Sequence, residues 1–293
     1  MHHPAEISLH QYMEDASNGK SSISEETIQQ VATDVADALR KQFGGGKKGD
    51  FRLRMSNVGR PTCQLWYEKN KPEVALPKPT TFIMNMMLGD IVEAVFKGLL
   101  TEAEVEDGDD GQVTLELDGA SINGTYDIDV DGAVDDIKSA SDWSYKNKFA
   151  SYESLSEGDS FGYIGQLAGY AKASGKKAGG WWVVNKANGQ FKYVPASGID
   201  VDQEVEKIQS TVDKVKEDKF ERCYEPVRET FRGKETGNTI LNPNCKFCSY
   251  RFDCWDTLVE RPAVMSKAKV PPTAAYIDLK NTGETDFFKG RAS

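Results

Sequence analysis

The chain has 293 residues, 39% of them hydrophobic, and a formal net charge of −10. This length suits one large domain or two modest ones, and the apolar content is sufficient for a packed core. The acidic balance argues mildly against a nucleic-acid partner, although basic residues gather at positions 47–60 and 172–177 and are compatible with a local basic groove. No apolar run approaches the length that spans a bilayer, and residues 1–11 lack the pattern of a secretory signal. We therefore expect a soluble, cytoplasmic protein.

The N-terminal part begins with a polar stretch at residues 1–21, which we expect to be loosely held. A helix should begin near Ser22, because Ser22 and Glu25 fit a capping box. Its apolar face repeats at helical spacing through Ile28, Val31, Val35, Leu39 and Phe43. The glycines at 44–46 should end it.

The rest of the chain alternates between helical and strand-like patterns. Helices are predicted within 56–70 and across 82–100, 163–173 and 200–220, and strands at 112–117, 124–130, 133–139, 181–185 and 191–194. This order predicts an α/β protein with a mixed central sheet flanked by helices. We divide the chain into an N-terminal extension at 1–55, a main domain at 56–260 and a polar tail at 261–293.

The segment from 124 to 138 carries the most specific local pattern, because Asp131-Gly132 is a favoured two-residue hairpin turn. Counting outward from that turn places Asp127 opposite Asp136, with both carboxylates on one face. Lys138 follows two residues after Asp136 and emerges on the same face. Opposed carboxylates repel each other unless a cation lies between them, and Mg²⁺ or Mn²⁺ prefers such oxygen ligands. Carboxylates, metal and lysine together suit phosphodiester hydrolysis.

Two other interpretations of this hairpin stay open from the residues alone. The spacing of Asp127, Asp129 and Asp131 resembles the opening of a calcium-binding EF-hand loop. That loop needs glutamate at its twelfth position, which here is Lys138. The segment is also compatible with a solvated acidic turn that has no chemistry. A structure that paired Asp129 with Asp136 would contradict the predicted register.

The element formed by Asp127 and Asp136-Ile137-Lys138 resembles the PD-(D/E)XK nuclease motif. Downstream, Gln166 and Tyr170 resemble the Gln-x-x-x-Tyr motif of the RecB-like branch, and their spacing puts both on one helix face. The pair is weakly specific alone and becomes moderately specific at this distance after the Asp-x-Lys element. The resemblance implies a restriction-endonuclease-like core.

The resemblance also implies roles for the site residues. Glu93 stands four residues after Gly89, where the family carries histidine; some members of the wider superfamily use a glutamate on this helix as a metal ligand. A surface glutamate on an amphipathic helix is the competing interpretation. The implied metal ligands are Asp127, Asp136, the backbone carbonyl of Ile137 and Glu93. Lys138 would position the attacking water, while Gln166 and Tyr170 would organise the site and contact the DNA strand.

Five cysteines stand at positions 63, 223, 245, 248 and 254, and this odd, clustered set predicts metal binding in a cytoplasmic chain. Cys63 precedes the nuclease motifs and Cys245, Cys248 and Cys254 follow them, an arrangement that resembles iron–sulfur RecB-like nucleases, including the CRISPR-associated and AddB-type members. In that group, four cysteines hold a [4Fe–4S] cluster that joins the C-terminal end to the N-terminal region. Spacing alone does not exclude tetrahedral zinc, and the resemblance favours iron–sulfur. Cys223 has no role in this pattern.

The resemblance covers residues from about 56 to 255 and includes no helicase motif, which implies a stand-alone, phage-type DNA exonuclease. We expect Mg²⁺ or Mn²⁺ as cofactor and DNA, single-stranded or with free ends, as partner in recombination, replication or repair. A second copy of the chain or a protein partner from these processes stays open. Candidates for base stacking are Trp66, Tyr67, Trp143, Tyr145, Trp181 and Trp182. Most aromatic residues are core residues, and Trp181–Val184 in particular has the pattern of a buried strand. Two other classes remain: a non-catalytic DNA-binding or adaptor protein with the nuclease fold, and a zinc-stabilised interaction module.

Overall fold

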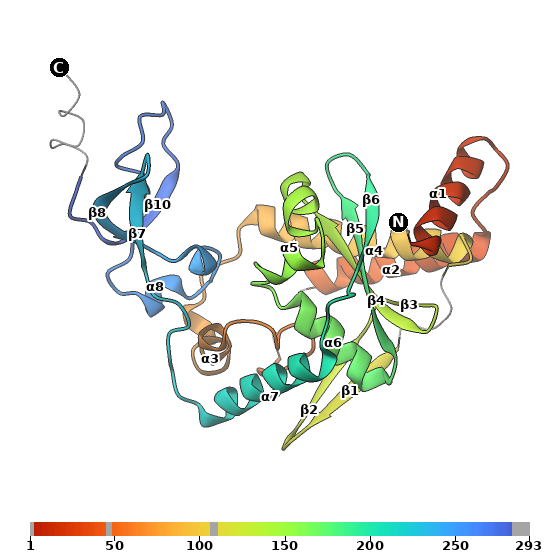
Figure 1. The fold of residues 1–293 in the computed structure, drawn as a ribbon, viewed down its shortest axis with the longest axis horizontal. Coiled ribbons are helices and arrows are strands. Elements are labelled where there is room, and N and C mark those ends of the chain that lie inside the picture. Colours follow the sequence, from red (N-terminus) through yellow and green to blue (C-terminus); the bar gives the residue numbers. More distant parts are fainter. Residues whose placement is uncertain (1–2, 45–48, 106–110, 283–293) are drawn as a thin grey trace. The chain divides into compact units, whose positions relative to one another are not determined.

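The computed structural model describes residues 3–44, 49–105 and 111–282, and the chain divides into two compact units. The first comprises residues 1–60 and 78–217, and the second comprises residues 61–77 and 218–293. Both units combine helices with strands, so the protein has the α/β composition that the sequence predicts (Figure 1). No helix within the described ranges is both long and apolar enough to cross a membrane.

A four-stranded mixed sheet forms the centre of the first unit. Its strands lie in the order β3 (Ile128–Val130), β4 (Ala133–Ala140), β5 (Lys177–Asn185) and β6 (Phe191–Pro195). β4 and β5 are parallel, and the outer strands β3 and β6 are antiparallel to their neighbours. The chain passes from β4 to β5 through a π-helical turn (Ser144–Lys148), α5 (Tyr152–Ser156) and α6 (Tyr163–Ser174). A separate hairpin consists of β1 (Gln112–Leu117) and β2 (Ala120–Thr125).

Helices cover both faces of this sheet. They are α1 (Pro4–Ser17) and α4 (Thr80–Glu102) on one face and α6 on the other, while α2 (Glu25–Phe43) packs on α4 and α7 (Val201–Glu217) packs on α6. Val134 of β4 belongs to a core shared with α6 and α7, whereas Ile137 belongs to a core shared with α1 and α4. Trp181 and Trp182 are adjacent on β5 and point to opposite faces, as successive strand residues do. Trp181 belongs to the core with α6 and α7, and Trp182 belongs to the core with α1 and α4. The sheet is therefore apolar on both sides, as expected for buried central strands.

The N-terminal region differs from the sequence-based expectation. Residues 1–21 were predicted to be loose, but α1 forms there and Leu9 is buried in the core with α4. The cap of α2 is Ser24 rather than Ser22, because the Ser24 side chain accepts a hydrogen bond from the amide of Thr27. Most of the predicted apolar face of α2 is not buried, and its largest member, Phe43, is 58% exposed.

The second unit contains a sheet in the order β7 (Val227–Phe231), β8 (Lys234–Ile240), β10 (Thr273–Asp278) and β9 (Val259–Pro262), with helices α3 (Thr62–Asn70) and α8 (Arg251–Cys254) and two short 3-10 turns (Pro72–Val74 and Pro243–Cys245). The segment predicted as a polar tail at 261–293 contains a strand in its described part, because β10 pairs with both β8 and β9. The hydroxyl of Tyr276 on β10 is buried and donates to Glu229 on β7.

The observed units do not follow the predicted boundaries at 55 and 260. Residues 1–55 belong to the first unit, since α1 contributes to the core of its sheet. Residues 61–77 and 218–293 form the second unit from two distant segments of sequence. The predicted strand at 124–130 is also interrupted, because β2 ends at Thr125 and pairs with β1, and β3 begins at Ile128.

Candidate active site

The β3–β4 hairpin has the register that was counted from the sequence. The paired residues are Ile128 with Asp135, Asp129 with Val134 and Val130 with Ala133. The turn residues Asp131 and Gly132 have φ angles of +52° and +72°, the left-handed conformation that a type I′ turn requires. One step beyond the paired residues, this register sets Asp127 opposite Asp136. The strands on both sides of the turn also contradict the helix–loop–helix arrangement of an EF-hand.

Asp127 is fixed against the backbone of β4. Its Oδ2 accepts a hydrogen bond of 2.7 Å from the amide of Ile137, at the position where the pairing of β3 with β4 stops. This side-chain contact accounts for the interruption of the predicted strand. The amide of Ile137 is thus engaged by Asp127, and its side chain lies in the core on the α4 face. A metal-binding role for the Ile137 carbonyl stays a prediction.

Asp136 and Lys138 form a close ion pair on β4. Lys138 Nζ lies 2.5 Å from each carboxylate oxygen of Asp136. The Asp136 side chain is 2% exposed and that of Lys138 is 19% exposed. In the described part of the chain, no hydrogen-bond donor is aligned with the buried Oδ2 of Asp136. One oxygen of this carboxylate therefore still has capacity for a ligand.

The charged groups around Asp136 and Lys138 shift the pKa of both side chains. Burial raises the pKa of Asp136, Lys138 opposes that increase, and the Asp127 carboxylate adds to it, with a net rise. Burial would lower the pKa of Lys138, but Asp136 and Asp127 outweigh it and raise the pKa. Lys138 is therefore a stable ammonium group at neutral pH, held among carboxylates.

Glu93 on α4 takes part in the same electrostatic cluster. Burial and the Asp127 carboxylate raise the pKa of Glu93 to about 7, although Lys97 and Lys138 lower it. Its Oε1 lies 3.4 Å from Nζ of Lys97. The Glu93 side chain is 37% exposed, and the effect of Asp127 on its pKa indicates that the two carboxylates are neighbours.

Gln166 and Tyr170 lie one turn apart on α6. Gln166 Nε2 donates to the Tyr170 hydroxyl across 3.3 Å. Burial raises the pKa of Tyr170 to about 12, with further increases from Asp127 and Asp136. The predicted motif thus reaches the carboxylates from the α6 face of the sheet. Its contact with DNA stays a prediction.

The carboxylates of Asp127, Asp136 and Glu93 fit a divalent cation by their chemistry. They are oxygen donors, the Asp127 carboxylate raises the pKa of both Glu93 and Asp136, and Asp136 has an oxygen without an aligned donor. Within the ranges that the structure describes, no three His, Cys, Asp or Glu side chains are already grouped closely enough to hold a metal ion. Binding would therefore require the three carboxylates to move closer together.

All five cysteines belong to the second unit. Cys223 had no predicted role, but it lies beside Cys63. The Cys223 sulfur accepts a hydrogen bond of 3.1 Å from the amide of Cys63 and lies 3.3 Å from Thr62 Oγ1. The hydrogen bond with Cys223, together with burial, raises the pKa of the Cys63 thiol. Charge on Cys223 also acts on Cys245 and Cys254. No spacing pattern points to Cys223, because its approach to Cys63 depends on tertiary structure.

The aromatic residues predicted as candidates for base stacking differ in how far their side chains are exposed. Trp181 and Trp182 are fully buried core residues of β5, as the buried strand predicted at Trp181–Val184 implies, and this excludes them as stacking residues. Trp143 is exposed, whereas Trp66 and Tyr67 contact Phe220 and each other within the second unit. Tyr145 receives the Lys192 ammonium over its ring. Sequence analysis did not single out Phe161, which is 56% exposed beside the start of α6.

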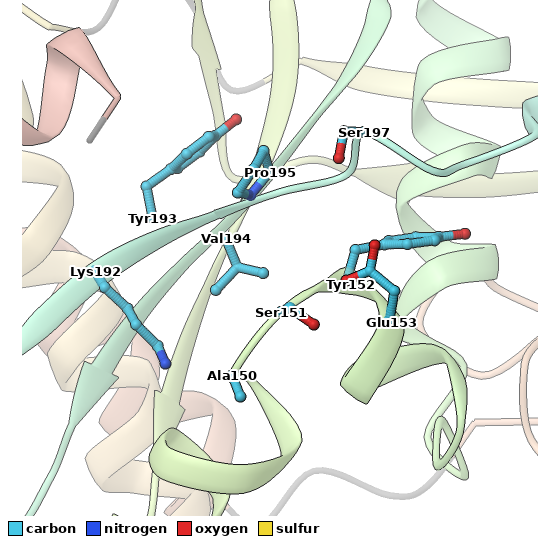
Figure 2. A pocket seen from close by; sticks show the side chains of 9 residues that line it. All are labelled: Ala150, Ser151, Tyr152, Glu153, Lys192, Tyr193, Val194, Pro195 and Ser197. Atoms are coloured by element: carbon cyan, nitrogen blue, oxygen red, sulfur yellow. The ribbon is translucent and has the colours of Figure 1, made fainter. Parts of the chain in front are cut away.

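A surface hollow lies between β6 and the segment that leads into α5 (Figure 2). Its lining residues are Ala150, Ser151, Tyr152, Glu153, Lys192, Tyr193, Val194, Pro195 and Ser197. None of the predicted site residues is among them. The Lys192 ammonium donates to the backbone carbonyl of Tyr145, which ties this cation to the fold. The chemistry of the hairpin, and not this hollow, therefore defines the candidate active site.

Comparisons with known proteins add little to this description. No protein-family model and no curated protein matches the chain. Among solved structures, SSO0001 is similar with a TM-score of 0.43 and 14% identity, over 80% of this chain and 98% of that chain. A likeness at this level carries no argument about function.

Proposed function

We propose that the protein is a metal-dependent nuclease that hydrolyses phosphodiester bonds in DNA, with a restriction-endonuclease-like core. One observation carries the proposal: the buried Asp136–Lys138 pair lies beside Asp127 on the hairpin, within electrostatic reach of Glu93 and Tyr170. A cluster of carboxylates around one buried ammonium is costly for stability, and such perturbed groups concentrate at functional sites.

Each side chain has a definite task in this proposal. A bound divalent cation would supply a water of lowered pKa and stabilise negative charge on the phosphate. Asp127, Asp136 and Glu93 supply the oxygen ligands for that cation. Lys138 stays protonated and donates hydrogen bonds to the attacking water or to a phosphate oxygen. Gln166 and Tyr170 would support this arrangement from α6.

We further propose that the substrate is DNA with a free end or a single strand, cleaved during recombination, replication or repair. The predicted basic segments support this substrate only in part. Lys172 is paired with Asp202, and Lys176 is paired with Asp129. Positions 47 and 48 lie outside the described residues. Other cations near the site, such as Lys148, would add to the electrostatic attraction of DNA.

The test is cleavage of end-labelled DNA, linear and circular, single- and double-stranded, with Mg²⁺ or Mn²⁺ and with chelator. We expect Asp136→Asn and Lys138→Ala to reduce the cleavage rate by about 10²–10⁴-fold. Asp131→Asn is the matched control, because it removes a carboxylate from the same hairpin while Asn-Gly preserves the turn. Undiminished cleavage by Asp136→Asn would contradict the proposal. DNA binding without cleavage by the wild type would favour the adaptor interpretation.

We propose a [4Fe–4S] cluster on Cys63, Cys245, Cys248 and Cys254, with zinc as the alternative. Its support is that cysteines from both ends of the chain belong to one unit. Purified protein should be brown and contain iron and acid-labile sulfide, whereas stoichiometric zinc in colourless protein would favour the interaction module. Cys63→Ser should lose metal and Cys223→Ser should keep it. The reverse result would make Cys223 the ligand.

A further inference from the structure

We propose that Phe161, Tyr163 and Lys148 form a binding site for one unpaired nucleobase and its phosphate, beside Lys138 of the candidate active site. The inference rests on the proposed nuclease function for the identity of its ligand. It assigns a position to the substrate strand that neither the nuclease motif nor the Gln-x-x-x-Tyr motif supplies.

Three aromatic rings run in series from the core to the surface. Phe149 is buried, and its ring centroid lies 5.8 Å from that of Tyr163 at an interplanar angle of 27°. The Tyr163 and Phe161 rings are 5.6 Å apart and nearly parallel, at 13°. Phe161, at the outer end, is 56% exposed. The series therefore ends in an exposed ring, with Tyr163 stacked on one side, where a further flat ring can be added.

Two ammonium groups flank this series. Lys138 Nζ lies 5.2 Å from the Tyr163 centroid, which connects the rings directly to the Asp136–Lys138 pair. Lys148 Nζ lies 4.6 Å from the Tyr163 centroid and 4.7 Å from that of Phe161. Burial lowers the pKa of Lys148, and the Asp159 carboxylate opposes that change. In the described ranges, no carboxylate comes within ion-pair distance of Lys148, so its ammonium group is available for a phosphate next to the exposed ring.

The backbone before α6 holds Phe161 in place. Gly162 has a φ angle of +74°, and a Cβ atom at Gly59 would lie 2.5 Å from the Gly162 Cα. The two backbones thus touch at a point where neither can carry a side chain. Asp159 Oδ2 accepts a hydrogen bond of 2.8 Å from the amide of Ile164, which fixes the first turn of the helix. A ring held in this way loses little conformational entropy when a ligand stacks on it.

The chemistry of the site selects an unpaired base. Every nucleobase has a π-face, so stacking on an aromatic ring tolerates all sequences, and a neighbouring cation binds the backbone phosphate. Bases inside a duplex are already stacked on their neighbours and present only their edges. A single strand or a frayed end therefore fits Phe161 better than an intact duplex, and its adjacent phosphate would lie toward Lys138.

The test compares Phe161→Ala and Phe161→Trp with Phe43→Ala, a similarly exposed phenylalanine (58%) on α2 in the same unit. The binding of a labelled single-stranded oligonucleotide is measured by fluorescence anisotropy in an Asp136→Asn background, and cleavage is measured separately in the wild-type background. We expect Phe161→Ala to weaken binding roughly 5- to 100-fold, the range for loss of one base stack. Phe161→Trp should retain binding, and Phe43→Ala should leave it unchanged.

Abasic sites then locate the base. Each nucleotide of the oligonucleotide is replaced in turn by an abasic residue. At one position, the abasic residue should weaken binding to the Asp136→Asn protein but not to the same protein with Phe161→Ala added. The two changes remove the same contact, so their effects do not add. Additive penalties at every position, or equal behaviour of Phe161→Ala and Phe43→Ala, would overturn the inference.

The same measurements separate this inference from the nuclease proposal on which it rests. If the wild type binds through Phe161 but does not cleave DNA, the base site stands and the nuclease proposal fails. If Phe161→Ala binds and cleaves DNA as the wild type does, the nuclease proposal stands and the base site fails.

Discussion

Asp135 and Asp136 are adjacent on β4 and both are buried, but their surroundings differ. Asp135 accepts hydrogen bonds from the amide of Gly180 at 2.7 Å, the Trp182 indole at 3.0 Å and the Tyr193 hydroxyl at 3.0 Å. All three donors are neutral and belong to β5 and β6. This carboxylate therefore joins the strands of the sheet, and its hydrogen-bonding capacity is used within the fold.

On the opposite face, Asp136 has the Lys138 ammonium and repelling carboxylates for neighbours. Its contacts are with charges that a phosphate or a cation can rearrange. Burial alone therefore does not identify a functional carboxylate. A buried acid with neutral donors serves the structure, whereas a buried acid among charges has interactions left for a ligand.

The largest expected effect separates these two neighbours. Asp136→Asn should reduce cleavage by about 10²–10⁴-fold, and it should also lower the free energy of unfolding because the Lys138 ammonium loses its ion-pair partner. Asp135→Asn should lower the free energy of unfolding by about 1–3 kcal/mol, because an amide nitrogen replaces one acceptor oxygen and leaves a buried donor unpaired. Unlike Asp136→Asn, it should leave cleavage by the folded protein nearly unchanged. Urea unfolding and cleavage assays of both variants check this. An exchange of the two phenotypes would refute the comparison.

An intermediate effect is expected at Glu93, the proposed third oxygen ligand. Glu93→Gln should raise the Mg²⁺ concentration for half-maximal cleavage by about 10-fold, in the range seen for groups that support metal sites. Lys97→Gln is a control, since it removes the ion-pair partner of Glu93 but no metal donor. An unchanged Mg²⁺ dependence in Glu93→Gln would mark Glu93 as a surface glutamate.

The smallest effect concerns pH and Asp135. Burial raises the pKa of Asp135 to about 7 in the folded protein, against about 3.9 when unfolded. A raised pKa means that the folded state binds the proton more tightly, so this contribution to stability is complete below about pH 4 and lost as pH rises through about 7. The stability advantage of wild type over Asp135→Asn should therefore shrink between pH 5 and 8 in urea titrations. A difference that is constant over this range would show that Asp135 does not titrate there.

Local patterns predicted the hairpin well. The turn at Asp131-Gly132 depends on two adjacent residues, so its register followed from counting and was confirmed. The burial of Leu9 in a polar stretch was not predictable, because the other large apolar residues of α1 do not share its face: Ile7 is 59% and Met13 is 41% exposed. The contact of Cys223 with Cys63 and the series from Phe149 to Phe161 also escaped prediction, since each requires tertiary approach.

The second unit is assembled from residues 61–77 and from 218 onward, with much of the first unit encoded between them. During synthesis, α3 emerges early but its unit cannot close until the ribosome has passed residue 218. We expect the sheet of the first unit to form in the meantime, since β3 to β6 are all encoded before that point. The order of synthesis along the chain thus differs from the order in which the units are completed. A nascent chain that ends before residue 218 would carry the hairpin of the first unit together with Cys63, while the other four cysteines are still to be synthesised.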